Sequence, residues 1–323
     1  MRRAIVLGTL VAAAALSIGV AAYQAPAGRG QTGANAPKVV EVQKLKDNLF
    51  VLTGAGSGGN TTVFVQSNGI TVVDTKNPGW GQPILDKIKE LSPKPVVRII
   101  NTHTHSDHVS GNVEFPTTVD IVVQANTAVN MKKMAPVTGL APAGAPNAPP
   151  QPTIFEQNGG KGLPKRTFKD RMTIDSGADR IELYYFGRGH TNGDAWVLFP
   201  ALRVLSIGDI FAWNNQLPIL DANNGGSGAE IADSLTKGDA ALGKLADQIV
   251  TGHSTVMTFD DLRKWADFNR GFLDAMRAAK KAGKSPEQVA KEWKAPAGFV
   301  PQDTPAAQTR LLANVQTIYN EIK

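Results

Sequence analysis

The chain contains no cysteine, and this absence excludes several kinds of chemistry at once. Disulfide bonds, a lipid-carrying cysteine, thiolate ligands to a metal and a cysteine nucleophile are all ruled out. Charged residues are scarce, at 19%, which is too few for a chain that stays unfolded, and hydrophobic residues make up 42%, enough to form a core. We therefore expect a folded protein of one large domain or two small ones.

A concentrated run of basic residues is missing as well. The formal net charge is +6, and part of it comes from Arg2 and Arg3 at the start of the chain. The other lysines and arginines are spread along the sequence, so we expect no nucleic-acid partner. The glycine-rich stretch 54–60 lacks the Gly-Lys-Ser/Thr ending of a phosphate-binding loop, and we interpret it as a flexible loop beside the functional site.

The first 22 residues are typical of an export signal. Basic residues are followed by an apolar, alanine-rich run from Ile5 to Ala22, with small residues at Ala21 and Ala22 where cleavage could occur. A membrane anchor that is not cleaved is the alternative. Residues 23–37 are rich in Gln, Ala, Pro and Gly and are expected to form a flexible tether. These features predict a periplasmic or secreted protein that is not embedded in a membrane once the signal is cleaved.

The rest of the chain alternates between strand and helix patterns, which predicts an α/β fold. Strands are expected at 38–43, 49–52, 61–66, 70–74, 96–101, 119–124, 171–174, 180–186, 195–199, 203–207 and 248–250, and helices at 83–91, 125–134, 231–245, 262–279, 286–293 and 306–322. We assign residues 38–258 to one domain and 259–323 to a C-terminal helical extension. Residues 135–165 are rich in Pro, Ala and Gly and form a long loop, either a lid over the site or a plain insertion.

Histidine is rare, with five in the chain, and three of them lie in one short segment. His103 and His105 are two residues apart, so in an extended segment they point the same way. Asp107 and His108 follow as the chain turns towards a helix. His190 and His253 each follow a glycine, and Asp209 follows Gly208. Imidazole and carboxylate are the ligands that zinc prefers in a site without cysteine.

These residues divide naturally into two metal sites. His103, His105 and His190 fill one, Asp107, His108 and His253 fill a second, and Asp209 could bridge both ions. Seven ligands suit two metals that lie ~3.5–4 Å apart and share a hydroxide. We expect two Zn²⁺ ions, although Mn²⁺ or Fe could occupy the same ligands.

The order of these motifs resembles the metallo-β-lactamase superfamily: His103-Thr-His-Ser-Asp-His108, Gly189-His190-Thr, Gly208-Asp209 and Gly252-His253. The resemblance covers about residues 40–255. It implies a four-layer αββα sandwich with the metal site at one edge between the sheets, and here with extra C-terminal helices. It also implies a hydrolase whose metal-bound hydroxide attacks the acyl carbon of a small molecule: an ester, lactone, amide or β-lactam.

Asp107 is the candidate catalytic residue, because a metal ligand beside the hydroxide can also orient it and take its proton. Asp194 could orient an imidazole or simply hold a turn. Other polar or aromatic side chains near the motifs could contact a substrate or be structural: Asn60, Arg188, Asn192, Trp213 and Asn214. Asp209 resembles the bridging carboxylate of glyoxalase II-like and lactonase-like members, and no lysine follows it to bind a β-lactam carboxylate.

Two other classes of function remain open on the same motifs. The first is an iron-dependent oxidoreductase similar to the persulfide dioxygenases, for which bound iron and oxygen uptake would be the signature. A flavodiiron protein fits less well, because its glutamate is absent at His105 and too few residues follow 259 for a flavin domain. The second is a binding protein that keeps the ligands without turnover.

Overall fold

The computed structural model describes residues 37–140 and 152–323. The predicted export signal and all but residue 37 of the predicted tether lie outside these ranges, as does part of the predicted loop at 135–165. The described chain from Pro37 onward forms one compact unit. No helix in the described ranges is long and apolar enough to cross a bilayer.

The N-terminal half of the unit builds a mixed sheet with the strand order β1 to β7. The first four strands run antiparallel, and β4 to β7 run parallel. Its strands are β1 (Glu41–Lys46), β2 (Leu49–Thr53), β3 (Thr61–Val65), β4 (Ile70–Val73), β5 (Val96–Ile100), β6 (Asp120–Gln124) and β7 (Arg166–Phe168). Because β5 is central and parallel to both its neighbours, the segment that follows it emerges at the middle of one sheet edge.

The second sheet has the order β12-β11-β10-β9-β8, antiparallel except between β11 and β12. Its strands are β8 (Arg171–Ile174), β9 (Ile181–Tyr184), β10 (Trp196–Phe199), β11 (Val204–Gly208) and β12 (Gln248–Thr251). The helices are α1 (Gly81–Leu91), α2 (Ser106–Val109), α3 (Ala125–Met131), α4 (Ile154–Gln157), α5 (Ile231–Leu242), α6 (Phe259–Lys281), α7 (Pro286–Glu292) and α8 (Pro305–Glu321).

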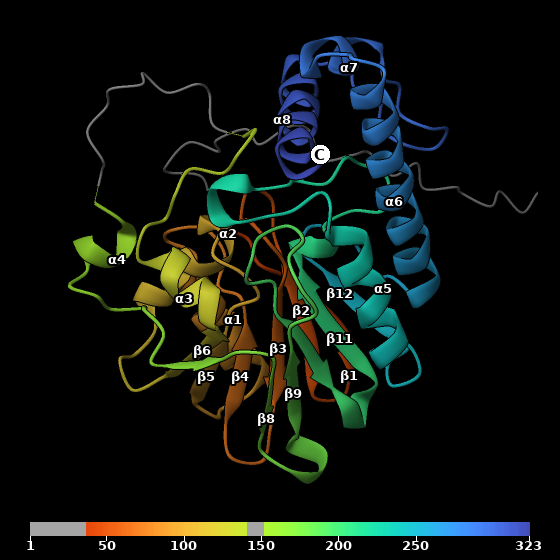
Figure 1. The fold of residues 1–323 in the computed structure, drawn as a ribbon. Helices are drawn as coiled ribbons and strands as arrows, with labels where there is room; N and C mark the ends of the chain where they lie inside the picture. Colours follow the sequence, from red (N-terminus) through yellow and green to blue (C-terminus); the bar gives the residue numbers. More distant parts are fainter. Residues whose placement is uncertain (1–36, 141–151) are drawn as a thin grey trace, which may run out of the picture. The chain divides into compact units, whose positions relative to one another are not determined.

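Alternation of side chains along the strands creates the layers. Val73 faces the second sheet and packs in one core with Val197, whereas its neighbour Val72 faces outward and packs with Ile84 of α1. In the second sheet Leu198 faces outward and packs in a core with residues of α5, α6 and α8. Figure 1 shows α5 and α6 beside β11 and β12, with α1 and α3 on the side of β4 to β6. The expected four-layer αββα sandwich with extra C-terminal helices is confirmed.

The structure differs from the sequence-based expectation at several element ends and in two short elements that the sequence did not predict. The first strand spans Glu41–Lys46 rather than 38–43. Its pairing with β2 starts at Glu41 and continues to the Asp47-Asn48 turn, where Lys46 pairs with Leu49. The segment 135–165 contains the short helix α4, whose Phe155 is fully buried. Strand β7 extends the sheet just after that segment, although its three residues carry no pattern that periodicity could detect.

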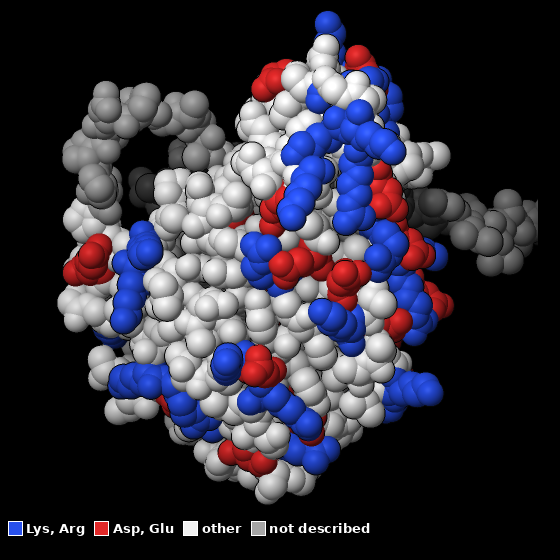
Figure 2. Space-filling view, in the orientation of Figure 1, with Lys and Arg blue, Asp and Glu red and all other residues white. Residues whose placement is uncertain are grey.

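Figure 2 shows positive and negative side chains mixed on this face, with wide uncharged areas between them. Two ion pairs join α5 and α6: Arg263 with Asp239 at 2.9 Å and Arg270 with Asp233 at 3.2 Å. Both pairs are partly exposed to solvent, so each adds at most about 1 kcal/mol to stability.

Candidate metal centre

The segment that follows β5 carries four of the candidate ligands to the edge between the two sheets. His105 precedes the short helix α2, and Asp107 and His108 lie within it. The Asn101 side chain donates to the backbone oxygen of His108 at 3.2 Å and holds this turn closed. The rings of His103 and His105 lie 4.7 Å apart, so the two-residue spacing places both imidazoles on the same side of the chain.

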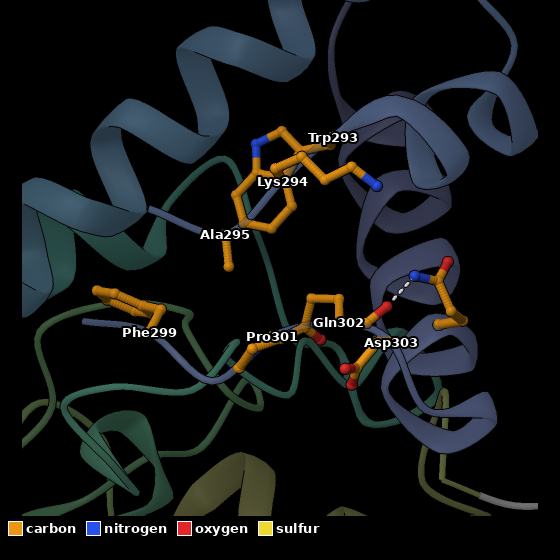
Figure 3. Close-up of a pocket in the computed structure, with 8 residues that line it drawn as sticks. Trp293, Lys294, Ala295, Phe299, Pro301, Gln302 and Asp303 are labelled. Carbon is orange, nitrogen blue, oxygen red and sulfur yellow. Dashed lines mark hydrogen bonds between the residues drawn. The ribbon is translucent and has the colours of Figure 1, made fainter. Parts of the chain in front are cut away.

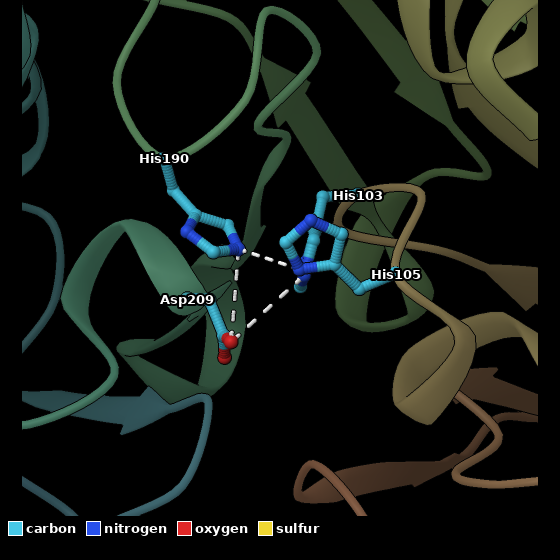
Figure 4. Close-up of side chains that lie close together, drawn as sticks. All are labelled: His103, His105, His190 and Asp209. Carbon is cyan, nitrogen blue, oxygen red and sulfur yellow. Dashed lines mark hydrogen bonds and ion pairs between the residues drawn. The ribbon is translucent and has the colours of Figure 1, made fainter. Parts of the chain in front are cut away.

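Four side chains meet in a first group, drawn in Figure 4: His103, His105, His190 and Asp209. One ligand atom of each lies within 4.8 Å of the others, and all four residues are buried. His190 Nε2 is 2.9 Å from His105 Nδ1 and 3.7 Å from Asp209 Oδ2. His103 Nε2 is 4.0 Å from the same carboxylate oxygen.

Asp107, His108 and His253 form a second group. His253 Nε2 lies 3.3 Å from both Asp107 Oδ2 and His108 Nε2. Asp209 borders this group too, with Oδ1 3.2 Å from His108 Nε2 and Oδ2 3.2 Å from His253 Nε2. The structure thus brings all seven predicted residues together, with the Asp209 carboxylate between the two groups.

A buried carboxylate orients His105 from outside the first group. Asp221 Oδ2 lies 2.7 Å from His105 Nε2, which leaves Nδ1 pointing to the centre. The other oxygen of Asp221 accepts hydrogen bonds from the backbone and the hydroxyl of Thr138, at 3.0 and 2.9 Å. The segment predicted as a loop therefore reaches the partner of a candidate ligand, and its described part is packed against the site.

A second buried carboxylate, Asp74, orients His108. Its Oδ2 lies 2.8 Å from His108 Nδ1 and also accepts from the Thr102 hydroxyl at 2.7 Å. That hydroxyl is 2.9 Å from Nδ1 of His103. Asp74 directly follows β4 in a left-handed conformation, with φ of 62°. Such partners fix the ring orientation of a metal-binding histidine and make it a better ligand.

Asp74 and Asp221 were not among the site residues predicted from the sequence. Asp74 was placed only as the end of a strand, and Asp221 carried no motif at all. One signal was available for Asp74: it lies at the carboxyl end of β4, beside β5, where polar groups of a parallel sheet gather. For Asp221 we find no sequence signal.

Asparagine in place of Asp74 is expected to weaken cation binding by the second group about 10- to 100-fold, as loss of such a partner usually does. The asparagine amide could still contact Thr102. It would no longer offer a charged oxygen to accept the hydrogen bond from His108 Nδ1. The measurement is competition with a chromophoric chelator. Asp86→Asn, on the exposed face of α1, should bind as wild type does, and equal affinity of both variants would contradict the role of Asp74.

The glycine-rich loop before β3 clamps the second group. Gly59 N donates to the backbone oxygen of Asp107 at 2.9 Å, and a Cβ on Gly59 would lie 2.1 Å from the His108 ring. Asn60 Nδ2 donates to the backbone oxygens of Thr251 and Ser254, at 2.9 and 2.8 Å, and so holds the turn that carries His253. Glycine is required at position 59 because only a residue without a side chain can lie so close to Asp107 and His108.

Lys76 is a buried cation behind this loop and was not predicted from the sequence. Its ammonium donates to the Gly59 backbone oxygen at 2.7 Å, and burial lowers its pKa to about 7, although Asp74 and Asp107 favour the charged form. The bond ties the loop to the end of β4.

Electrostatics distinguish the histidines of the two groups. Burial and the neighbouring imidazoles hold the pKa of His103 well below its usual range, and burial with His105 lowers the pKa of His190 to about 4. Burial would raise the pKa of Asp209, yet the adjacent His253 and His108 hold it well below its usual range. In the second group burial acts on the histidines in the same direction, but Asp209 and Asp74 hold the pKa of His108 well above its usual value, and Asp209 and Asp107 raise that of His253. The first group therefore combines neutral imidazoles with a carboxylate, which is the donor set a cation requires.

Residues that could contact a substrate fall into two sets. Trp213 stacks on His253, with ring centroids 5.5 Å apart, and Asn214 is exposed nearby in sequence. Arg188 is engaged elsewhere, with Glu230 at 2.7 Å, and the Asn192 side chain accepts from Asn130 at 2.8 Å.

Asp194 accepts from the backbone and the hydroxyl of Thr191, at 3.0 and 2.6 Å. It therefore fixes the turn that carries His190, which is the simpler of its two predicted roles. Burial raises its pKa to about 7.

One observation supports a cation at this centre independently of any motif. His103 Nε2 is buried and finds no hydrogen-bond partner among the described residues. A buried polar nitrogen without a partner costs about 1–3 kcal/mol, and this one points at Asp209 and His190. A bound cation would satisfy it, so the residues present fit the group.

A cavity of about 290 Å³ lies apart from these ligands, within the C-terminal helical region (Figure 3). Its lining includes Trp293, Phe299 and Pro301, with Lys294, Gln302 and Asp303 at its polar parts. None of the seven candidate ligands lines it, so it is separate from the metal centre.

Comparison with known proteins agrees with the geometry. One relative is a metallo-beta-lactamase type 2 from Elizabethkingia meningoseptica, 29% identical over 190 residues that cover 54% of this chain and 66% of that protein. Another is a hydroxyacylglutathione hydrolase from Nostoc punctiforme, 27% identical over 207 residues that cover 62% of each. The matched regions thus span slightly less than two thirds of the length of these curated relatives.

Solved structures establish the fold. A metallo-beta-lactamase from Pontibacter korlensis superposes with a TM-score of 0.55 at 19% identity, covering 72% of this chain and 99% of that one. The inverting sec-alkylsulfatase Pisa1 from Pseudomonas sp. reaches 0.62 at 16% identity, covering 88% of this chain and 50% of that one.

The family model of the metallo-beta-lactamase superfamily matches residues 54–253, which is more than half of the chain and includes every candidate ligand. The chain therefore belongs to the metallo-beta-lactamase superfamily.

Proposed function

We propose that the protein is a metal-dependent hydrolase that holds two zinc ions and attacks the acyl carbon of a small-molecule ester, lactone, amide or β-lactam. The observation that carries the proposal is the arrangement of seven side chains, six of them buried, in two adjoining groups with Asp209 between them. Both curated relatives carry names of hydrolases, a metallo-beta-lactamase and a hydroxyacylglutathione hydrolase. These names do not favour the iron-dependent oxidoreductase alternative.

In this proposal His103, His105 and His190 would hold one cation, Asp107, His108 and His253 would hold the other, and Asp209 would contribute to both sites. When bound, the two cations supply Lewis acidity and lower the pKa of a water towards neutrality. Asp107 orients that water and accepts its proton. Asp221 and Asp74 keep two of the imidazoles in their binding orientation.

The exposure of the ligands indicates where a substrate enters. The His253 side chain is 13% exposed and that of Asp107 9%, whereas those of His103, His108 and His190 are at most 1% exposed. A substrate therefore reaches the centre from the side of the second group, beside Asp107.

The test is hydrolysis of a chromogenic β-lactam by the purified mature chain with zinc added, followed by a panel of lactones, esters and thioesters. Asp107→Ala serves as the control, and oxygen uptake by the iron-loaded protein is measured in parallel. Turnover of any acyl substrate that the variant lacks supports the proposal and identifies the substrate class. Oxygen uptake with iron and no hydrolysis with zinc would replace it with the oxidoreductase alternative.

A sulfate ester is a second candidate substrate class, because one observation favours it. The alkylsulfatase structure covers 88% of this chain, against 72% for the β-lactamase, so the similarity in fold extends further along the chain. A secondary alkyl sulfate belongs in the same panel, with sulfate release as the measurement.

We also propose that the chain is exported to the periplasm or secreted, on the basis of the basic and apolar pattern in residues 1–22. Mass spectrometry of the chain expressed at full length would show the new N-terminus near Ala22. Retention of residues 1–22 in the membrane fraction would favour the anchor instead.

A further inference from the structure

One short segment of the chain orients two histidines of the first group. It is segment 217–221, which lies between β11 and α5 in the sequence and is buried throughout. Ile219 O lies 2.7 Å from His190 Nδ1, and Asp221 Oδ2 lies 2.7 Å from His105 Nε2. Whatever fixes the backbone of this segment therefore fixes the imidazoles of the first group.

The contact with Ile219 determines which nitrogen of His190 carries the proton. A backbone oxygen can only accept a hydrogen bond, so Nδ1 donates, and the lone pair of the neutral ring lies on Nε2. Nε2 is the nitrogen that lies 2.9 Å from His105 Nδ1 (Figure 4). The direction of the Ile219 carbonyl therefore decides whether His190 presents a metal-binding nitrogen to the centre.

Asn314, a buried residue on α8, holds the peptide group to which this carbonyl belongs. The peptide between Ile219 and Leu220 is planar, with its C=O and N–H on opposite edges. Its C=O accepts from His190, and its N–H donates to Asn314 Oδ1 at 3.3 Å. On the other side of Ile219, Pro218 O accepts from Asn314 Nδ2 at 2.8 Å. A single amide side chain thus fixes the backbone on both sides of Ile219.

Helix α8 contacts the surroundings of the first group in two further ways. Leu217 and Leu220 share one core with apolar residues of α8. Near the end of the helix, Glu321 pairs with Arg188 at 3.2 Å, and Arg188 lies two residues before His190. Because the helix is anchored on both segments, the amide of Asn314 acts from a fixed element.

We propose that Asn314 is a positioning residue for the first cation site, and that it acts on His190 through the peptide between Ile219 and Leu220. Hydrogen bonds on the two edges of one peptide group strengthen each other, and a partner that fixes a metal-binding imidazole makes it a better ligand. Asn314 lies outside residues 54–253, which the family model matches, so this support comes from the C-terminal helices of this chain. The inference rests on the proposed two-cation centre and concerns the first of its sites.

The experiment follows the five histidines of the chain by nitrogen NMR, first without metal and then during titration with zinc. Three of them report the first group and two report the second. Metal-free wild type should show a single tautomer of His190, protonated at Nδ1. Asn314→Ala should show both tautomers, and its first group should bind zinc about tenfold more weakly while the second group is unchanged.

Two further variants of Asn314 make the test specific. Asn314→Asp keeps an oxygen that can accept from Leu220 N, so it should retain more of the first-group affinity than Asn314→Ala. Should Asn314→Ala not fold, Asn314→Leu, which fills the space of the amide, takes its place with the same expected result.

Asn269→Ala is the matched control. Asn269 is a buried asparagine on α6 whose amide donates to Trp265 O at 2.8 Å within the same helix. The control therefore also removes a buried amide from a C-terminal helix, and it should bind zinc in both groups as wild type does. Equal losses of affinity in both groups, or in this control, would overturn the positioning role. A weaker first group with an unchanged His190 tautomer would overturn the route through the peptide.

These measurements separate the positioning role from the hydrolase proposal, because neither depends on turnover. If no acyl substrate is hydrolysed while Asn314→Ala shows the expected changes, hydrolysis fails and the positioning role stands. If acyl substrates are hydrolysed and Asn314→Ala binds zinc as wild type does, the positioning role fails and the hydrolase stands. A wild-type chain that binds no zinc would overturn both.

Discussion

Alanine in place of Asp107 is expected to lower kcat by about 10³-fold or more while the protein stays folded. The carboxylate belongs to the second group, 3.3 Å from His253 Nε2, and is one of the more exposed candidate ligands. In the proposed reaction it both contacts a cation and takes the proton of the attacking water, so alanine removes two contributions at once. Because α2 keeps its backbone contact from Gly59 to Asp107 O, the turn itself should survive.

Two variants divide these contributions. Asp107→Asn keeps the shape and one oxygen ligand but removes the proton acceptor, so it should retain more metal than Asp107→Ala and still be slow. Rates are measured with whichever acyl substrate the wild type hydrolyses, and metal content by mass spectrometry of the same samples. Asp86→Asn, on α1, is the control: it also removes a carboxylate, but away from the centre, and should leave rate and metal content unchanged. Turnover of Asp107→Ala within tenfold of wild type would exclude the role proposed for this residue.

The local motifs were enough to predict which residues meet at the centre. His103, His105 and His108 are close in sequence, so spacing alone places them together, and His190, Asp209 and His253 each follow a glycine at a strand end or turn. Gly252 shows why: a Cβ there would lie 1.8 Å from Asp209 Oδ1, so the approach of the His253 turn to that carboxylate requires glycine. Such rare residue types in fixed order carry a strong signal.

Residues that support the centre could not be predicted in this way. Asp74 and Asp221 are acids among many, and what distinguishes them is burial beside an imidazole, which depends on how β4 and the segment before α5 pack. Lys76 follows Asp74-Thr75 in a Pro-Gly-containing turn, where a lysine usually lies at the surface. Its burial against Gly59 is a property of the tertiary structure.

For the fold, too, regular local patterns were predictable from the sequence, and short elements held by tertiary packing were not. Strands with clear alternation and long helices were expected close to where they occur, because period-2 and period-3.6 patterns survive in single sequences. The short elements β7 and α4 were missed, since three or four residues cannot show a period. Phe155 in α4 is buried by its contacts with the core under α1 rather than by any property of its own segment.

Asp209→Ala is expected to reduce the cation content from two to at most one per chain and to remove most of the stabilisation that cations provide. Its two oxygens lie 3.2 Å from His108 and His253, and Oδ2 lies 3.7 Å from His190, so both groups share it. Without Asp209, the two cations would have five imidazoles as ligands and Asp107 as the only remaining carboxylate of the seven. When no cation is bound, the histidines would repel one another on protonation, because the carboxylate between them is gone.

Thermal unfolding measures how much the bound cations stabilise the folded protein. A cation present at 1,000 times its Kd stabilises the folded protein by about 4 kcal/mol, and in a chain of this size each kcal/mol shifts Tm by roughly 2–4 °C. A chelator should therefore lower the Tm of wild type by about 10 °C and that of Asp209→Ala by much less. Asp239→Ala, which removes a partly exposed carboxylate on α5 that pairs with Arg263, should respond to the chelator as wild type does. An equal chelator-induced drop in Asp209→Ala would mean that the cations bind without this carboxylate, and the bridging position between the two groups would then have to be assigned to another ligand.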